Sequence, residues 1–241
     1  MRLRLPALAA ITAVTLLAAC GSDDDSTGVT APPATDGASA TSAPADTSTG
    51  GGAAASSECP PDGGFDEQTR EFDAAPPECL DPDITYEAIV TTNKGEFTIT
   101  LDPQSAPVAA NNFAWLAGHR YFDDTECHRI IPDFVVQCGD PTATGTGGPG
   151  YTIVDEPPQP GAYEIGSVAM AKTAAPDSAG SQFFIITGAN GAALPPEYAL
   201  FGQVTSGFDT TVEAMAAAGT PGAGTPSEPI VIESVRITAT S

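Results

Sequence analysis

Positive charge is scarce in this sequence. Its 241 residues include 8 lysines and arginines but 31 aspartates and glutamates, which gives a formal net charge of -23 at pH 7. A surface this negative repels phosphate backbones, so nucleic acid is excluded as a partner. There are only 2 histidines, and the sequence contains neither a GxSxG serine nor a CGxCW-type cysteine that His119 or His128 could activate. A nucleophile of these kinds is therefore not expected.

An apolar run long enough to span a bilayer is also missing. The run Leu5–Leu17 follows Arg2 and Arg4 and is too short for an anchor helix, so residues 1–20 are predicted to be a signal peptide. Its end, LAAC, resembles the lipobox of bacterial lipoproteins, in which the cysteine is lipidated and becomes the mature N-terminus. We expect an extracytoplasmic protein anchored to the bacterial cell membrane through lipid on Cys20. The alternative is an ordinary secretory signal in which Cys20 is incidental.

Aromatic residues are absent from residues 21–57, which consist mainly of Ser, Thr, Ala, Gly, Pro and Asp. This stretch cannot bury enough apolar surface to offset the entropy lost on ordering, so it is predicted to be a disordered acidic tether. Residues 58–82 differ, because Phe65 and Phe72 appear and two cysteines bracket the segment. In an oxidising compartment Cys59 and Cys79 are expected to form a disulfide. A redox-active pair is the alternative, but the spacing is not CxxC.

Residues 83–241 have the pattern of a mainly β domain. Tyr86–Thr92 and Glu96–Leu101 flank Asn93-Lys94-Gly95, a hairpin signal, and apolar and polar residues alternate in the second run. Six further strand signals follow, at His128–Ile131, Phe134–Gln137, Ile165–Met170, Phe183–Thr187, Ala199–Val204 and Ile230–Thr238. Many short strands and few helices indicate a closed barrel, which removes exposed strand edges.

Two helices are predicted in this domain, at Ser105–Leu116 and Asp209–Ala218. In the first, Ser105 can cap, Pro107 suits the first turn and Gly118 follows the end. Its core-facing stripe consists of Ala109, Phe113 and Leu116. We therefore expect this helix to serve packing rather than the site.

The most specific signal lies in Cys127–Asp140, CHRIIPDFVVQCGD. Two short apolar runs flank Pro132–Asp133, a pair suited to a tight connection between strands. Arg129 and Gln137 are polar side chains within these runs, and on this evidence alone Arg129 would be a solvated surface cation. Further along, the chain has GTGG at residues 145–148, MA at 170–171 and GSQFFI at 180–185.

The blocks HRIIPxFxxQxGD, GTGG, MA and GSQFFI, in this order and spacing, resemble the cyclophilin family of peptidyl-prolyl isomerases. The resemblance covers about Thr85–Ile237. It implies a mainly β, closed eight-stranded antiparallel barrel capped by two α-helices. It also implies a peptidyl-prolyl cis-trans isomerase that needs no cofactor and no metal.

The resemblance assigns roles to individual residues. The catalytic residues it implies are Arg129, Phe134 and Gln137, with Arg129 as the donor of a guanidinium fork. The substrate contacts it implies come from Val135, Gly145, Ala171, Lys172, Gln182, Phe184, Leu194 and Tyr198. Four positions depart from the usual pattern. Val135 replaces methionine, Lys172 replaces asparagine and precedes a loop one residue longer, Tyr198 replaces histidine, and Ala193 stands where many eukaryotic members have tryptophan.

Two other interpretations apply to the same region. Gly145–Gly150 satisfies GxGxxG, but a dinucleotide site needs a strand before it and a helix starting within it, whereas Pro149 and the β-like Tyr151–Val154 follow. We expect a loop beside a groove instead. Cys127, His128 and Cys138 suggest a metal site, but neighbours on a strand point to opposite faces and no fourth ligand is evident. If Arg129 pairs near Gln137, the two cysteines face each other, which predicts a cross-strand disulfide rather than two free thiols.

The expected function is isomerisation of X–Pro bonds in secreted or envelope proteins by a monomer, which assists their folding. The barrier, about 20 kcal/mol, arises from amide resonance. A catalyst needs only to bind the twisted amide better than either planar isomer. The alternative is a module that binds proline-containing segments with little turnover.

Overall fold

The computed structural model describes residues 58–240. The predicted signal peptide, the tether and the lipid on Cys20 lie outside this range. Within it, no helix combines the length and the hydropathy that crossing a membrane requires.

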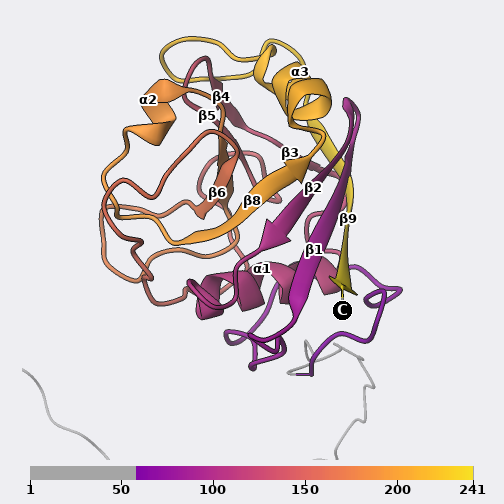
Figure 1. Cartoon of the computed structure of the whole chain (residues 1–241). Coiled ribbons are helices and arrows are strands. Elements are labelled where there is room, and N and C mark those ends of the chain that lie inside the picture. Colours follow the sequence, from indigo (N-terminus) through magenta and orange to yellow (C-terminus); the bar gives the residue numbers. More distant parts are fainter. Residues whose placement is uncertain (1–57, 241) are drawn as a thin grey trace, which may run out of the picture. The chain divides into compact units, whose positions relative to one another are not determined.

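The described residues form one antiparallel sheet with the strand order β3-β9-β1-β2-β8-β6-β7-β5-β4 (Figure 1). The strands are β1 Thr85–Thr92, β2 Gly95–Leu101, β3 Thr125–Glu126, β4 Arg129–Ile131, β5 Val135–Cys138, β6 Ser167–Met170, β7 Phe183–Ile186, β8 Leu200–Ser206 and β9 Val231–Thr240. Every predicted strand is present. The two-residue β3 was not predicted, because so short a segment has no periodicity.

The two outer strands of this order belong to one continuous stretch of chain. Only Cys127 and His128 separate β3 from β4, and β3 pairs with β9 while β4 pairs with β5. Between them the N–H of Cys127 donates to the carbonyl of Ile230 at 2.8 Å. The stretch 125–131 therefore joins both margins of the sheet and closes it into a barrel. When this stretch is taken as one strand, the eight-stranded prediction is confirmed.

The barrel interior is filled by alternating strand residues and by one helix. In β2 the side chains of Phe97, Ile99 and Leu101 are buried, as the alternation predicts. Phe113 enters from the helix and packs against two strand phenylalanines and one from the turn after the helix. The centroid distances are 5.2 Å to Phe183, 5.1 Å to Phe201 and 5.0 Å to Phe122. These rings form the centre of the main core.

Helix α1, Pro107–Gly118, lies at one end of the barrel and α3, Glu213–Ala216, at the other (Figure 1). The predicted stripe is buried and Pro107 begins the helix. The prediction that Ser105 caps it was wrong, since the N-cap is Ala106, which makes no side-chain capping bond. Instead the carboxylate of Glu156 accepts the N–H groups of Val108 at 3.0 Å and Ala109 at 2.8 Å. Because Glu156 lies 47 residues from Ala109, this capping interaction leaves no signal in the sequence around the helix.

The second predicted helix is only partly α-helical. It begins with a π-helical turn, η1 Phe208–Val212, and continues as α3 Glu213–Ala216. The turn follows Gly207, which has a φ of 77° and whose added Cβ would lie 2.5 Å from the carbonyl oxygen of Glu96. A further short helix, α2 Ala189–Ala192, was not predicted.

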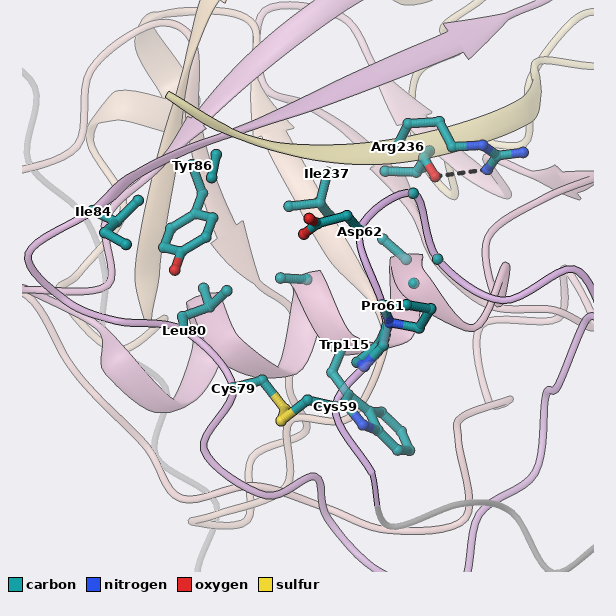
Figure 2. Close-up of a pocket in the computed structure, with 18 residues that line it drawn as sticks. Cys59, Pro61, Asp62, Cys79, Leu80, Ile84, Tyr86, Trp115, Arg236 and Ile237 are labelled. Atoms are coloured by element: carbon teal, nitrogen blue, oxygen red, sulfur yellow. Dashed lines mark hydrogen bonds between the residues drawn. A yellow bond between two sulfur atoms is a disulfide. The ribbon is translucent and has the colours of Figure 1, made fainter. Parts of the chain in front are cut away.

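Residues 58–82 form a strap that packs along α1. The predicted disulfide Cys59–Cys79 is formed, with a Cα–Cα distance of 5.4 Å. Figure 2 shows it beside Trp115, at the margin of a cavity of about 310 Å³ between the strap and β9. The disulfide thus closes the strap where it crosses the helix.

Candidate active site

The β4–β5 hairpin has the predicted register. Arg129 lies opposite Gln137, and the tip contains Asp133 in a left-handed conformation with a φ of 55°. The Asp133 carboxylate accepts hydrogen bonds from the N–H of Ala189 at 2.9 Å and from Nδ2 of Asn190 at 2.7 Å. The start of α2 therefore holds the hairpin tip in place.

A row of hydrogen bonds crosses the strands from Arg129. Its Nη1 donates to Oε1 of Gln137 at 3.2 Å, and Nε2 of Gln137 donates to Oε1 of Gln182 at 3.0 Å. Nε2 of Gln182 in turn donates to the carbonyl of Gly147 at 3.0 Å. Among the described residues, Arg129 forms no ion pair. Its guanidinium therefore keeps donors that can bind an oxygen or nitrogen of a ligand.

An apolar cluster separate from the main core lies beside this row. Its buried members are Val135, Tyr163, Ala169, Phe184 and Ile186, and the half-buried Phe134, Ala171, Ala192, Leu194, Tyr198 and Leu200 pack against them. The guanidinium carbon of Arg129 lies 5.6 Å from the centroid of the Phe134 ring. A cation therefore stands at the rim of an apolar patch.

Tyr198 is fixed within this cluster by two kinds of contact. Its ring meets Phe184 edge-on at 5.4 Å. The hydroxyl of Tyr163 donates to the carbonyl of Tyr198 at 2.6 Å and accepts its N–H at 2.9 Å. Burial raises the pKa of Tyr163 to about 12, so this hydroxyl keeps its proton at neutral pH. Tyr198 is thus positioned as a wall of the apolar patch.

The GTGG loop is held by Asp140, a residue for which the sequence predicted no role. The buried carboxylate accepts four backbone N–H groups, from Thr142 at 2.7 Å, Thr144 at 3.1 Å, Gly145 at 2.7 Å and Gly147 at 3.0 Å. Burial alone would raise the pKa of Asp140, but the hydrogen bonds outweigh it and lower the pKa to about 2. The only local signal was the spacing of Asp140 and Thr142, which suits a side-chain turn.

This loop forms one wall of a groove of about 350 Å³ next to the hydrogen-bonded row. The wall consists of the predicted Gly145 and the residues up to Pro149, and Ala171, Lys172 and Gln182 lie around it. No helix follows the loop, so the rejection of a dinucleotide motif agrees with the structure.

Ala171 and Lys172 are already engaged within the protein. The N–H of Ala171 donates to the carbonyl of Gln182 at 2.8 Å, so this amide is not available to a peptide in the observed geometry. The half-buried ammonium of Lys172 forms an ion pair with Asp155. Lys172 lines the groove and also a second cavity that contains Tyr198. It therefore forms the wall between the two.

The predicted disulfide Cys127–Cys138 is formed, with a Cα–Cα distance of 4.0 Å. Both sulfurs are used in it, and residues 58–240 contain no group of three His, Cys, Asp or Glu residues that could hold a metal. His128 lies under the GTGG loop, where an added Cβ on Gly145 would be 3.6 Å from its ring. Burial lowers the pKa of His128. The prediction of a cross-strand disulfide between these two cysteines is confirmed.

The structure brings the eleven predicted site residues to one face. Arg129, Gln137 and Gln182 form the polar row, and Gly145 and Lys172 line the groove beside it. The others belong to the apolar cluster: Phe134, Val135, Ala171, Phe184, Leu194 and Tyr198. Such a face can hold a small apolar ring while a fixed donor acts on a neighbouring polar bond.

Comparisons with known proteins give consistent similarities. A sequence model of the family described as "Cyclophilin type peptidyl-prolyl cis-trans isomerase/CLD" matches residues 88–237. A probable peptidyl-prolyl cis-trans isomerase B of Mycobacterium leprae is 36% identical over 171 residues, which are 64% of this chain and 57% of that protein. The isomerase B of Bacillus subtilis is 45% identical over 118 residues, 48% of this chain and 80% of the other. The chain spans about half the length of the first mycobacterial relatives, 57% and 49%.

The fold is also similar to solved structures. A crystal structure of a cyclophilin type peptidyl-prolyl cis-trans isomerase of Cryptosporidium parvum has a TM-score of 0.59 and 30% identity, and covers 65% of this chain and 99% of its own. A second structure of that protein, in the presence of the dipeptide Ala-Pro, has a TM-score of 0.58 and 31% identity, with 64% and 99% covered.

Proposed function

Because the chain belongs to the cyclophilin-type peptidyl-prolyl cis-trans isomerase family, we propose that it catalyses the cis–trans isomerisation of X–Pro bonds. The observation that carries this proposal is the position of the Arg129 guanidinium, 5.6 Å from the Phe134 ring and hydrogen-bonded to Gln137. It places a hydrogen-bonded cation at the rim of an apolar patch.

The apolar cluster receives the proline ring in this mechanism. Phe134 and Phe184 contact the ring, and Tyr198 closes one side. Because the ring is held, rotation about the X–Pro bond moves the residue that precedes proline. The protein then distinguishes the twisted amide from both planar isomers through groups that surround the moving carbonyl.

Arg129 supplies that discrimination. As the amide twists, resonance is lost and the proline nitrogen becomes a hydrogen-bond acceptor, while the carbonyl is no longer conjugated with it. A guanidinium donor aimed at this nitrogen binds the twisted state better than either planar one. Gln137 fixes one edge of the guanidinium, so little entropy is lost when the substrate binds. The reaction makes and breaks no covalent bond, and it needs no cofactor.

The substrates we propose are proline-containing segments of extracytoplasmic proteins. The Cryptosporidium parvum relative was crystallised in the presence of Ala-Pro, which supports a small X–Pro unit as the minimal ligand. Two disulfides, Cys59–Cys79 and Cys127–Cys138, favour an oxidising compartment. We further propose that the protein acts there as a monomer, anchored to the bacterial cell membrane through lipid on Cys20. Intact-mass analysis of the native protein should find an acylated Cys20 at the N-terminus, and cleavage elsewhere contradicts the anchor.

The decisive experiment measures isomerisation directly. Exchange between the cis and trans forms of a short X–Pro peptide is followed by NMR with and without the full chain. The proposal expects exchange that is faster in proportion to enzyme concentration. Line broadening that shows binding without faster exchange would identify a proline-segment-binding module instead.

A further inference from the structure

The strap, residues 58–82, is bonded to α1 and to the turn that follows it. The N–H groups of Phe65 and Thr69 donate to the carbonyls of Gly118 at 2.8 Å and His119 at 3.0 Å. At its other end Oδ1 of Asn111 accepts the N–H of Cys79 at 2.7 Å. The strap is therefore an integral layer on the outside of the helix.

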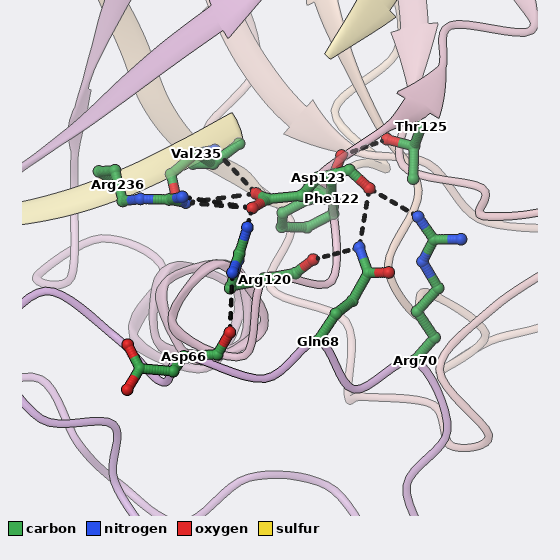
Figure 3. A network of polar contacts seen from close by, with 9 residues as sticks. All are labelled: Asp66, Gln68, Arg70, Arg120, Phe122, Asp123, Thr125, Val235 and Arg236. Atoms are coloured by element: carbon green, nitrogen blue, oxygen red, sulfur yellow. Dashed lines mark hydrogen bonds and ion pairs between the residues drawn. The ribbon is translucent and has the colours of Figure 1, made fainter. Parts of the chain in front are cut away.

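Its middle part is tied to the buried Asp123, as Figure 3 shows. Nη2 of Arg70 and Nε2 of Gln68 donate to the carbonyl of Asp123 at 2.6 Å and 2.9 Å. The Asp123 carboxylate accepts Nε of Arg120 at 2.9 Å and Nη1 of Arg236 at 3.3 Å. The bonds from Gln68 and Arg70 fix this part of the strap to the turn after α1.

One strap residue then reaches the back of the groove wall. The Phe72 ring is 5% exposed and packs between aromatic rings, with centroid distances of 4.4 Å to Trp115 and 6.4 Å to both Tyr121 and Tyr151. Tyr151 itself lines the groove. The hydroxyl of Tyr121 lies 2.8 Å from that of Ser181, another groove residue. The Phe72 ring thus supports two walls of the groove from behind.

The Phe72 backbone makes a second connection to the same wall. Its N–H donates to the carbonyl of Pro149 at 2.9 Å. Gly150 has a φ of 98°, and a Cβ added there would lie 2.5 Å from the carbonyl oxygen of Phe72. The loop and the strap therefore approach each other at a distance that only glycine permits. This contact lies at the opposite end of the loop from Gly145.

We propose that the strap is a positioning element of the substrate groove, and that Phe72 is the residue through which it acts on the Gly145–Gly150 loop. The inference deepens the proposed function, because the expected change in KM rests on the proposed isomerase activity. Phe72 lies behind the wall, so it does not touch the substrate. Its expected influence is on peptides long enough to enter the groove, whereas an Ala-Pro unit in the apolar cluster is unaffected.

The test compares Phe72→Ala with Phe65→Ala in the full chain. Phe65 is a phenylalanine of the same strap whose ring packs on His119 at 4.7 Å. The Phe72 ring also contacts His119, at 5.1 Å, but packs in addition on Tyr121 and Tyr151. Hydrogen exchange of residues 142–151 should be accelerated by about fivefold or more in Phe72→Ala and unchanged in Phe65→Ala. KM for a peptide with three residues on each side of X–Pro should rise about tenfold in Phe72→Ala, while kcat stays within about twofold.

Other outcomes separate this inference from the proposed function. If the loop exchanges normally in Phe72→Ala, or equally fast in both variants, the positioning role is wrong even when the wild-type protein is active. If the wild-type protein isomerises no peptide, the proposed function fails, and hydrogen exchange still decides the role of the strap. Should Phe72→Ala fail to fold, Phe72→Leu removes the ring contacts but keeps apolar volume. It should then show the same accelerated exchange, and normal exchange in that variant overturns the inference.

Discussion

Nη1 of Arg129 lies 3.2 Å from Oε1 of Gln137, directly across the β4–β5 pair. A tight turn separates the two residues in the sequence, and they face each other on adjacent strands. The bond uses one donor of the guanidinium, and among the described residues no carboxylate pairs with the others.

Arg129→Ala should lower kcat/KM for a short X–Pro peptide by roughly a hundredfold or more, the scale of losing one preorganised charged donor. Arg129→Lys should not restore it, because an ammonium cannot reproduce the planar fork. Arg236→Ala is the matched control, since it removes an arginine at the far Asp123 network and should leave kcat/KM unchanged. Near-native turnover in Arg129→Ala would mean that another group acts on the amide.

Asp140→Asn should loosen the GTGG loop and lower stability at neutral pH. The pKa of Asp140 is lowered from its ordinary value of 3.8 to about 2, so its ionised form stabilises the fold above the unfolded pKa. This contribution, about 2 kcal/mol, is lost as the pH falls from about 4 through 2. Urea unfolding at pH 7 and pH 2 measures it. The wild-type protein and Asp140→Asn should differ at pH 7 and converge at pH 2, and a constant difference contradicts the assignment.

The Cys127–Cys138 disulfide should serve stability rather than turnover. The double variant Cys127→Ala, Cys138→Ala is expected to lose about 3 kcal/mol of unfolding free energy at most, since the bridge closes a short loop. Turnover measured well below the melting temperature should stay near the wild-type value. The melting temperature and the turnover are compared with those of the double variant Cys59→Ala, Cys79→Ala, which removes the other disulfide. Loss of turnover in a folded Cys127–Cys138 variant would show that the bridge shapes the site.

Ala193 predicts weak binding of cyclosporin, a ligand of many cyclophilins. This residue is exposed at the end of α2, next to Leu194 of the apolar cluster, and lacks the indole that could donate a hydrogen bond and supply apolar contact. Ala193→Trp should therefore tighten cyclosporin binding in a fluorescence titration. Ala189→Trp adds the same ring at the other end of α2 and should not. Equal affinity of all three proteins would show that the alignment at this position is wrong.

The sequence allowed the hairpin and its surroundings to be predicted because their signals are local. Two short apolar runs, the Pro132-Asp133 turn between them and a cysteine at the outer end of each run indicated that Arg129 pairs near Gln137, and the structure shows this pairing. Their roles were assigned through the family resemblance and remain predictions.

Asp140 was missed for a different reason. Four N–H groups converge on it only after the loop has folded, so the residue has no distinguishing pattern of its own. The same holds for Glu156 at the start of α1 and for Phe72 in the strap, whose partners are far away in the sequence. A single contact between distant segments produces no periodic pattern in the sequence, so such contacts could not be predicted.

The pairing of β9 with both β1 and β3 has a consequence for biosynthesis. Strand β9, at the very end of the described chain, pairs with β1 at the beginning of the domain and with β3. While the chain is still emerging, β1 lacks this neighbour and presents unpaired backbone groups to other polypeptides. The sheet reaches its final form only when β9, Val231–Thr240, has been released. A protein proposed to assist the folding of others is therefore itself exposed to mispairing until β9 has emerged and paired with β1.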